Sequence, residues 1–138
     1  MARIGGIALA VAILGVPLLP AAQVFQGKTR PAKTGTLMKV LFKPHFGAVE
    51  TALKGAGPQG EAAWGTLYEQ AAVLNEMAHA LLEDGRCPDK AWAGACSQLK
   101  EASFRIMAAT DRKDVKEARA GAAAIKASCA ACHSAHKK

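Results

Sequence analysis

The feature that most constrains this chain is a short run near its C-terminus, Cys129-Ala130-Ala131-Cys132-His133. On an α-helix, side chains three and four residues apart share one face, so the two thiols and the imidazole would point the same way. Cys-x-x-Cys-His is the attachment sequence of c-type haem, in which both thiols bond to the haem vinyl groups and the imidazole binds the iron. The motif therefore predicts a helix that carries one covalent haem c through Cys129, Cys132 and His133.

Two other uses of these cysteines, a zinc site and a redox pair, fit the sequence less well than haem. Cys87 and Cys96 could add two thiolates to a zinc site, but the eight residues between them are not the short spacing typical of structural zinc. A thioredoxin-like redox pair would lie beside a strand-helix-strand pattern, and the sequence shows no strand pattern. The histidine directly after the second cysteine of the motif favours haem.

The N-terminus carries an export signal. Residues 4–25 contain no charged side chain and follow a short basic start with Arg3. The run of about 22 residues is long enough to cross a bilayer, although Pro17 and Pro20 interrupt a helix. Residues 1–25 are therefore either a cleaved signal peptide or a retained membrane anchor, and residues beyond them lie outside the cytoplasm.

An extracytoplasmic, periplasmic location has a consequence for the two remaining cysteines. Disulfides persist in oxidising compartments, so Cys87 and Cys96 are predicted to pair.

The net charge of +7 comes from basic residues interleaved with acidic ones, a pattern that does not predict nucleic-acid binding. It indicates a mild preference for an acidic redox partner protein.

The polar residues 26–34 are predicted to be a linker, and the domain begins at residue 35. Apolar residues then recur at helical spacing in four stretches. These predict helices over residues 36–54, 60–84, 88–110 and 112–136, with a kink or an irregular turn at Pro44 and Asp111 as the candidate N-cap of the last helix. Four such helices with short connections predict an all-α, antiparallel four-helix bundle over residues 35–138, with the haem filling part of its core.

A helical bundle whose single haem motif lies on the last helix resembles the class II cytochromes c, the group of cytochrome c′ and cytochrome c-556. The similarity is most specific at residues 127–138, ASCAACHSAHKK. There the family has Cys-x-x-Cys-His, two further residues, an aromatic residue and a basic residue. His136 stands at the aromatic position and Lys137 at the basic one, which implies that Lys137 contributes to haem binding and that His136 lies at the haem edge or surface.

Residues 41–49, LFKPHFGAV, carry a second similarity to this family. They resemble the segment of the family's first helix that packs over the open face of the haem. Gly35-Thr36 replaces an Arg-Gln pair that contacts the haem propionates in the family, so Lys39 or Lys43 would take that role. The resemblance also implies a homodimer formed through the first two helices.

The sixth iron ligand separates the functions that the family offers. Met38 is the candidate in this chain, although alignment to the family places the ligand position at Lys39; ordinary core packing of Met38 is the alternative. His45 lies seven residues after Met38, on the same helical face, and is a second candidate. His79 is expected at the surface.

With Met38 bound, the chain is expected to be a monohaem electron-transfer protein rather than an enzyme, because no hydrolytic or transferase constellation is present. With an apolar residue over that face, it would instead bind nitric oxide or carbon monoxide at a five-coordinate haem, as cytochrome c′ does. A third alternative is a haem subunit of a respiratory or photosynthetic complex, associated with the membrane through residues 4–25.

Overall fold

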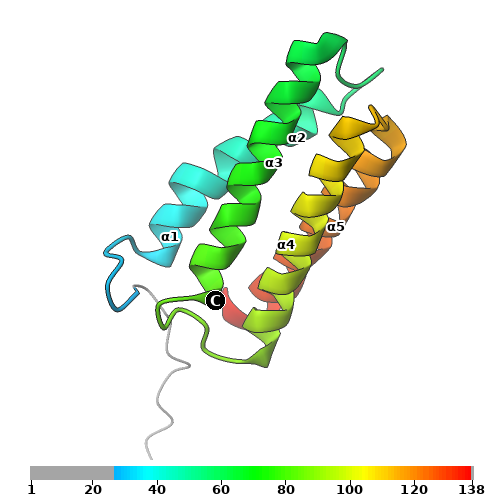
Figure 1. The fold of residues 1–138 in the computed structure, drawn as a ribbon. Helices are drawn as coiled ribbons and strands as arrows, with labels where there is room; N and C mark the ends of the chain where they lie inside the picture. Colours follow the sequence, from blue (N-terminus) through cyan, green and yellow to red (C-terminus); the bar gives the residue numbers. More distant parts are fainter. Residues whose placement is uncertain (1–26, 138) are drawn as a thin grey trace, which may run out of the picture.

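A computed structural model describes residues 27–137, which are all-α (Figure 1). The elements are α1 (Thr34–Leu37), the π-helical turn η1 (Met38–Phe42), α2 (Lys43–Ala52), α3 (Gly60–Leu82), α4 (Lys90–Asp111) and α5 (Val115–His136). The first three follow one another without a break and form one rod, called the first helix below. The predicted export segment and residue 138 lie outside the described residues.

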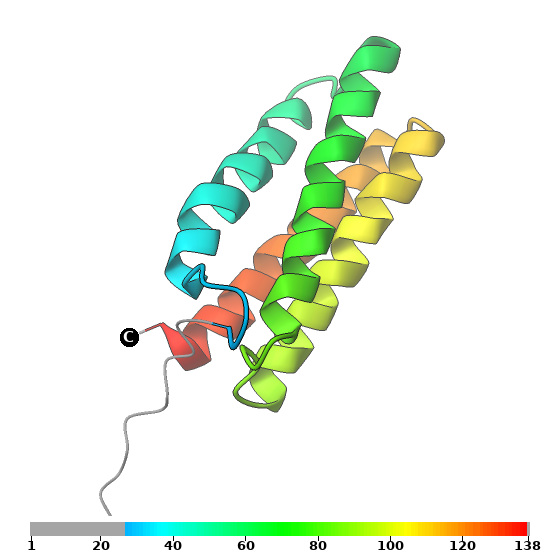
Figure 2. The ribbon, with the colours of Figure 1, turned by 60° about the vertical axis from the view of Figure 1, so that its left-hand side comes forward.

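The first helix, α3, α4 and α5 pack as a bundle, which confirms the predicted all-α bundle. Consecutive helices run in opposite directions and are joined by short connections at the two ends (Figures 1 and 2). Helix α3 packs on the first helix and on α4, and α4 packs on α5. The interior is apolar; its fully buried members include Val49, Leu67, Leu74, Ile106 and Ile125. No helix between residues 27 and 137 is long and apolar enough to cross a membrane.

The start of α5 differs from the prediction. Asp111 is the last residue of α4, and Asp114 is the N-cap of α5, where its side chain accepts a hydrogen bond from the backbone N–H of Glu117. The end of α4 is closed by two backbone bonds, from Lys113 to Thr110 and from Asp114 to Ala109, with Lys113 at φ 52°. This left-handed closure uses the residues after Asp111, so the next helix begins later than the aspartate pattern indicated.

Gly121 lets α4 and α5 approach closely. A Cβ at this position would lie 2.6 Å from Cγ1 of the buried Ile106 and 3.0 Å from the backbone oxygen of Ala102. Because both helices are long and rigid there, neither atom can move away freely. The absence of a side chain at Gly121 therefore fixes the distance between the last two helices.

We expect Gly121→Ala to destabilise the fold by about 1–3 kcal/mol, the usual cost of overpacking a core. Gly94 is the matched control, because it is exposed in α4 and a Cβ there meets nothing within 4 Å. Gly94→Ala should stabilise by about 0.5–1 kcal/mol. Urea unfolding of the three proteins measures both effects, and equal midpoints for the two variants would contradict the close packing.

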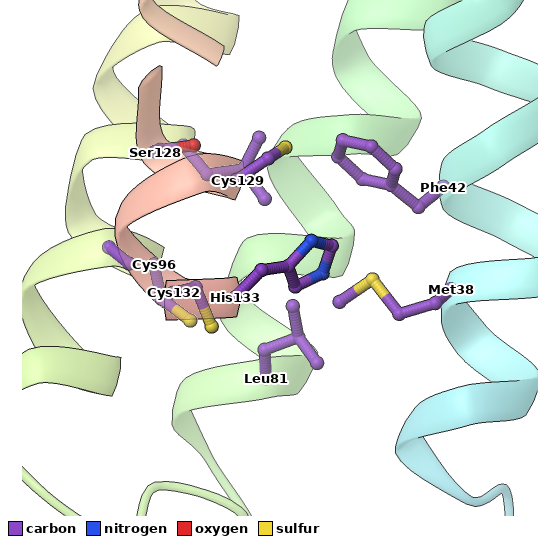
Figure 3. Close-up of a pocket in the computed structure, with 10 residues that line it drawn as sticks. Met38, Phe42, Leu81, Cys96, Ser128, Cys129, Cys132 and His133 are labelled. Atoms are coloured by element: carbon purple, nitrogen blue, oxygen red, sulfur yellow. The ribbon is translucent and has the colours of Figure 1, made fainter. Parts of the chain in front are cut away.

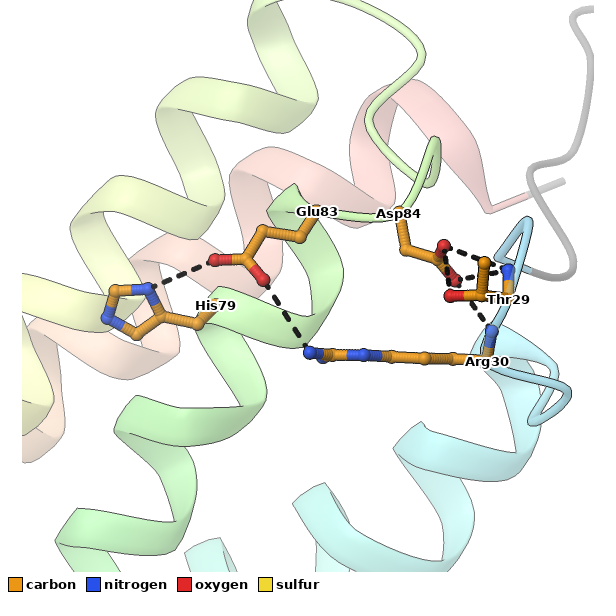
Figure 4. A network of polar contacts seen from close by, with 5 residues as sticks. All are labelled: Thr29, Arg30, His79, Glu83 and Asp84. Carbon is orange, nitrogen blue, oxygen red and sulfur yellow. Dashed lines mark hydrogen bonds and ion pairs between the residues drawn. The ribbon is translucent and has the colours of Figure 1, made fainter.

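Residues 27–33 lie along the loop between α3 and α4, and Asp84 holds them there (Figure 4). Its carboxylate accepts hydrogen bonds from the backbone N–H groups of Thr29 and Arg30, at 2.9 and 2.8 Å, and from the Thr29 hydroxyl. These bonds, first the one from Arg30, lower the pKa of Asp84. The start of the first helix is thereby fixed to the end of α3.

The buried side chain of Arg86 also bonds to residues 27–33. Its side chain is only 1% exposed, and its guanidinium donates to the backbone oxygens of Ala32, at 2.7 Å, and Arg30, at 3.0 Å. A buried guanidinium needs such acceptors because desolvation of a charge is costly. Both views of the ribbon place residues 27–33, the α3–α4 loop and the C-terminal end of α5 at one end of the bundle (Figures 1 and 2).

Candidate functional site

The haem motif lies on the last turns of α5, where it lines an apolar pocket (Figure 3). Cys129 and Cys132 are half-buried at its α5 wall, and His133 is exposed at its open side. The three side chains share one helical face, as their spacing requires. Ser128 lies behind them and is turned back on the helix, since its hydroxyl donates to the backbone oxygen of Ile125 at 2.8 Å.

The other walls come from three different helices. Met38 and Phe42 project from η1 toward His133, with Leu81 of α3 below them (Figure 3). Helix α4 contributes Ala95, Cys96 and Leu99. Apart from the cysteines and His133, the lining is almost wholly apolar, which suits a large aromatic cofactor.

The pocket as folded here is small, and it would have to widen to hold a haem. It contains about 40 Å³, whereas cofactor and ligand sites usually measure roughly 300–1,000 Å³. Widening is easiest between the first helix and α5. The first helix packs on α3 and α5 packs on α4, whereas the first helix and α5 are not a closely packed pair. The donor groups and the apolar lining therefore fit haem c, and its insertion requires the first helix to move outward.

Two polar side chains of α5, which lie before the haem motif, bond to the first helix and to the turn after it. Lys126 pairs with Glu50 at 2.6 Å, and Arg119 donates to the backbone oxygens of Leu53, at 3.1 Å, and Gly55, at 2.6 Å. These contacts, and the bonds that hold residues 28–32 to Asp84 and Arg86, are among the constraints on any outward movement of the first helix.

The π-helical turn places His45 away from the pocket lining. The backbone N–H of Lys43 bonds to the oxygen of Met38, five residues back, so the turn holds one residue more than an α-helical turn. Seven residues then no longer complete two turns, and His45 is rotated away from Met38 by about 100°. Its Nδ1 lies 2.6 Å from Oε1 of Gln70 on α3, and His45 is not among the residues that line the pocket.

The predicted bridge between Cys87 and Cys96 is not formed. Both are free thiols, and Cys87 Sγ is turned toward the backbone oxygen of Asp89 at 3.5 Å. Cys96 faces the pocket instead, beside Cys132 (Figure 3). Spacing in the sequence could not show this, because the direction of Cys96 depends on how α4 is rotated in the bundle.

Burial controls the acidity of the pocket thiols. It raises the pKa of Cys96 from 9.0 to about 12, with smaller contributions from Cys132 and Cys87. Burial likewise raises the pKa of Cys129 and of Cys132. All three are therefore protonated near neutral pH, the state in which thiols react least with alkylating agents and oxidants.

The free thiols give a prediction that separates this structure from the sequence expectation. At pH 8, Cys96 should alkylate much more slowly than Cys87, because burial raises the pKa of Cys96 to about 12 and leaves its side chain only 3% exposed. Cys87→Ser and Cys96→Ser variants assign the label by mass spectrometry. If neither site is labelled even after unfolding without a reductant, a disulfide is present and the free thiols are refuted.

The remaining sequence candidates lie away from the pocket lining. Lys39, Lys43 and Lys137 are exposed, and Lys137 directly follows α5. His136 packs edge-on to Trp92 with ring centroids 5.3 Å apart, and its side chain is 16% exposed. His79 is a surface residue beside Glu83, as expected (Figure 4).

Sequence reasoning missed some of the lining. Four lining residues have no functional role predicted from the sequence: Phe42, Leu81, Leu99 and Ser128. Their convergence depends on helix rotation, for which a single sequence carries no direct signal.

Among residues 27–137, no three or more His, Cys, Asp or Glu side chains form a group that could hold a metal ion.

Comparison with protein-family models, with curated proteins and with solved structures found no match for this chain.

Proposed function

We propose that this chain is a monohaem c-type cytochrome that transfers electrons outside the cytoplasm. The proposal rests on one observation: side chains suited to haem attachment and iron ligation line the same apolar pocket from two different helices. Cys129, Cys132 and His133 line it from α5, and Met38 lines it from the first helix (Figure 3). Two thiols, one imidazole and one thioether are the side chains that haem c attachment and six-coordinate ligation need.

Each residue has a separate role in this proposal. Cys129 and Cys132 hold the cofactor by thioether bonds, and His133 is the proximal ligand. Met38 is the sixth ligand, and a thioether in that position raises the reduction potential. The bound haem supplies the ferrous–ferric couple, while Phe42 and Leu81 keep water from that side.

The surface and the N-terminus support the location and the partner. The basic balance of the chain, +7, favours a redox partner with an acidic face. Residues 4–25 make the chain a periplasmic protein, either released or anchored. Because residues 28–30 are bonded to Asp84 at the haem-motif end, a retained anchor would hold that end near the membrane, an arrangement compatible with the alternative of a tethered subunit of a membrane complex.

Gas binding is the second candidate function. Phe42 lies beside Met38 on the same wall, so an apolar ring is ready to cover the iron's open face if the thioether does not bind it. A five-coordinate iron under an apolar lid would take carbon monoxide or nitric oxide. Gas binding and electron transfer differ in whether the Met38 thioether binds the iron, and optical spectroscopy detects that bond directly.

The test is an optical spectrum of the full-length protein in both oxidation states, made in a host with haem-maturation machinery. The colour should survive acid-acetone extraction, because thioether bonds are covalent. The ferric form should be low-spin with a thioether-to-iron charge-transfer band, and the ferrous form should be slow to take up carbon monoxide. A colourless or zinc-containing product rejects the cytochrome, and a high-spin spectrum moves gas binding ahead.

A further inference from the structure

The first helix changes its winding at the residues that face the haem motif. It is α-helical at Thr34–Leu37, π-helical at Met38–Phe42 and α-helical again from Lys43. The bond from the Lys43 N–H to the Met38 oxygen spans five residues, whereas an α-helical bond spans four. The two pocket residues of this helix, Met38 and Phe42, are the first and last residues of that turn.

Pro44 supplies a local cause for the wide turn. Proline has no N–H to donate, and in a regular helix its ring collides with the carbonyl four residues back, which here belongs to Val40. Opening of the preceding turn removes that collision, and both proline and π-helical turns are recognised sites of kinks in helices. Pro44 is exposed, so nothing in the core requires a proline at this position.

The extra residue changes which side chain faces the pocket. Each residue advances an α-helix by about 100°, so an inserted residue rotates everything before it by that angle relative to α2. Helix α2 is fixed on the core by Phe46 and Val49, which are 8% and 0% exposed. If the helix were regular back from these anchors, Lys39 would take the direction that Met38 has now.

This shift also matches the offset of one residue between Met38 and Lys39, the position that alignment with the resembled family assigns to the ligand. In a regular helix Lys39 would take this direction, and the one added residue gives the direction to Met38. A helix without the turn would present a lysine to the pocket. Met38 would turn away from Leu81, with which it shares the pocket lining.

We infer that Pro44 is a positioning residue for the sixth ligand: by forcing the π-helical turn, it rotates Met38 onto the wall opposite His133. The inference rests on the proposed function for the identity of the ligand, but the rotation is a property of the chain itself. Pro44 touches no cofactor and acts through the register of the helix.

The experiment moves the methionine and the proline independently. Pro44→Ala should remain folded, because alanine is the best helix former and the site is exposed. It should lose the thioether-to-iron band and become high-spin or lysine-ligated. The exchange Met38→Leu with Lys39→Met, made in the chain with Pro44, should also lack the band, whereas the same exchange combined with Pro44→Ala should restore it.

A readout that needs no haem accompanies the spectra. Nuclear Overhauser contacts between the methyl groups of Met38 and Leu81 should be present in the unmodified protein and lost in Pro44→Ala. Retention of the band and of these contacts in Pro44→Ala overturns the inference. Failure of the triple variant to regain the band overturns it too, since the loss would then reflect general damage. If the unmodified protein shows no haem or no thioether band, the proposed ligand fails, and the Met38–Leu81 contacts alone decide the role of Pro44.

Discussion

Replacement of both Cys129 and Cys132 by alanine is expected to abolish covalent haem and to leave a bundle that is poorly folded. The thioether bonds are the only covalent attachment that this motif offers. Without the cofactor, the first helix packs mainly on α3, and it meets α5 at the pocket lining and through the side chains of Lys126 and Arg119. The loss of stability should reach at least about 4 kcal/mol, the size seen when a structural metal or disulfide is lost.

The matched control for this pair is Cys87→Ala with Cys96→Ala, which also removes two thiols. These residues should be dispensable for attachment, because Cys87 does not line the pocket and Cys96 lies on α4 outside the motif. Absorbance after acid-acetone extraction measures attachment, and urea unfolding measures stability. Equal haem loss in both double variants, or full colour in the motif variant, would refute attachment through Cys129 and Cys132.

The bundle was within reach of sequence reasoning because each helix carries a long apolar stripe. Trp64, Leu67, Ala71 and Leu74 step by three and four, and all are buried in α3. Stripes of this kind depend on local periodicity, which a single sequence contains. The end of α4 and the start of α5 were harder, because both Asp111 and Asp114 suit an N-cap and only the closure through Lys113 selects the second.

The walls of the pocket were less predictable, since they depend on rotations of helices relative to one another. The sequence predicts Met38 as a candidate ligand, and the structure places it in the pocket lining. The irregular turn before Pro44 gives Met38 this direction, and the sequence indicates a kink or an irregular turn at Pro44 but not the added residue. The same turn places His45 away from the pocket lining. One added residue in a helix thus changes the directions of two candidate side chains, and a count of α-helical steps does not include it.

Met38→Ala is expected to convert a low-spin haem into a high-spin one that binds carbon monoxide readily. Met38 faces His133 across the pocket, and alanine has no donor atom to replace the thioether (Figure 3). The affinity for carbon monoxide should rise by at least about tenfold, since the gas no longer displaces a bond worth more than roughly 1.4 kcal/mol. The reduction potential should fall, because a thioether ligand raises it.

Val40→Ala is the control, because Val40 lies in the same π-helical turn but is 59% exposed and away from the pocket. It should keep the low-spin spectrum and the slow uptake of carbon monoxide, which shows that the turn tolerates a truncated side chain. Spectra of the ferric proteins and rapid mixing of the ferrous proteins with the gas measure both properties. If the unmodified protein is already high-spin and binds carbon monoxide as fast as Met38→Ala, the thioether is not a ligand. Phe42 would then cover an open iron, and gas binding would replace electron transfer as the function that this pocket supports best.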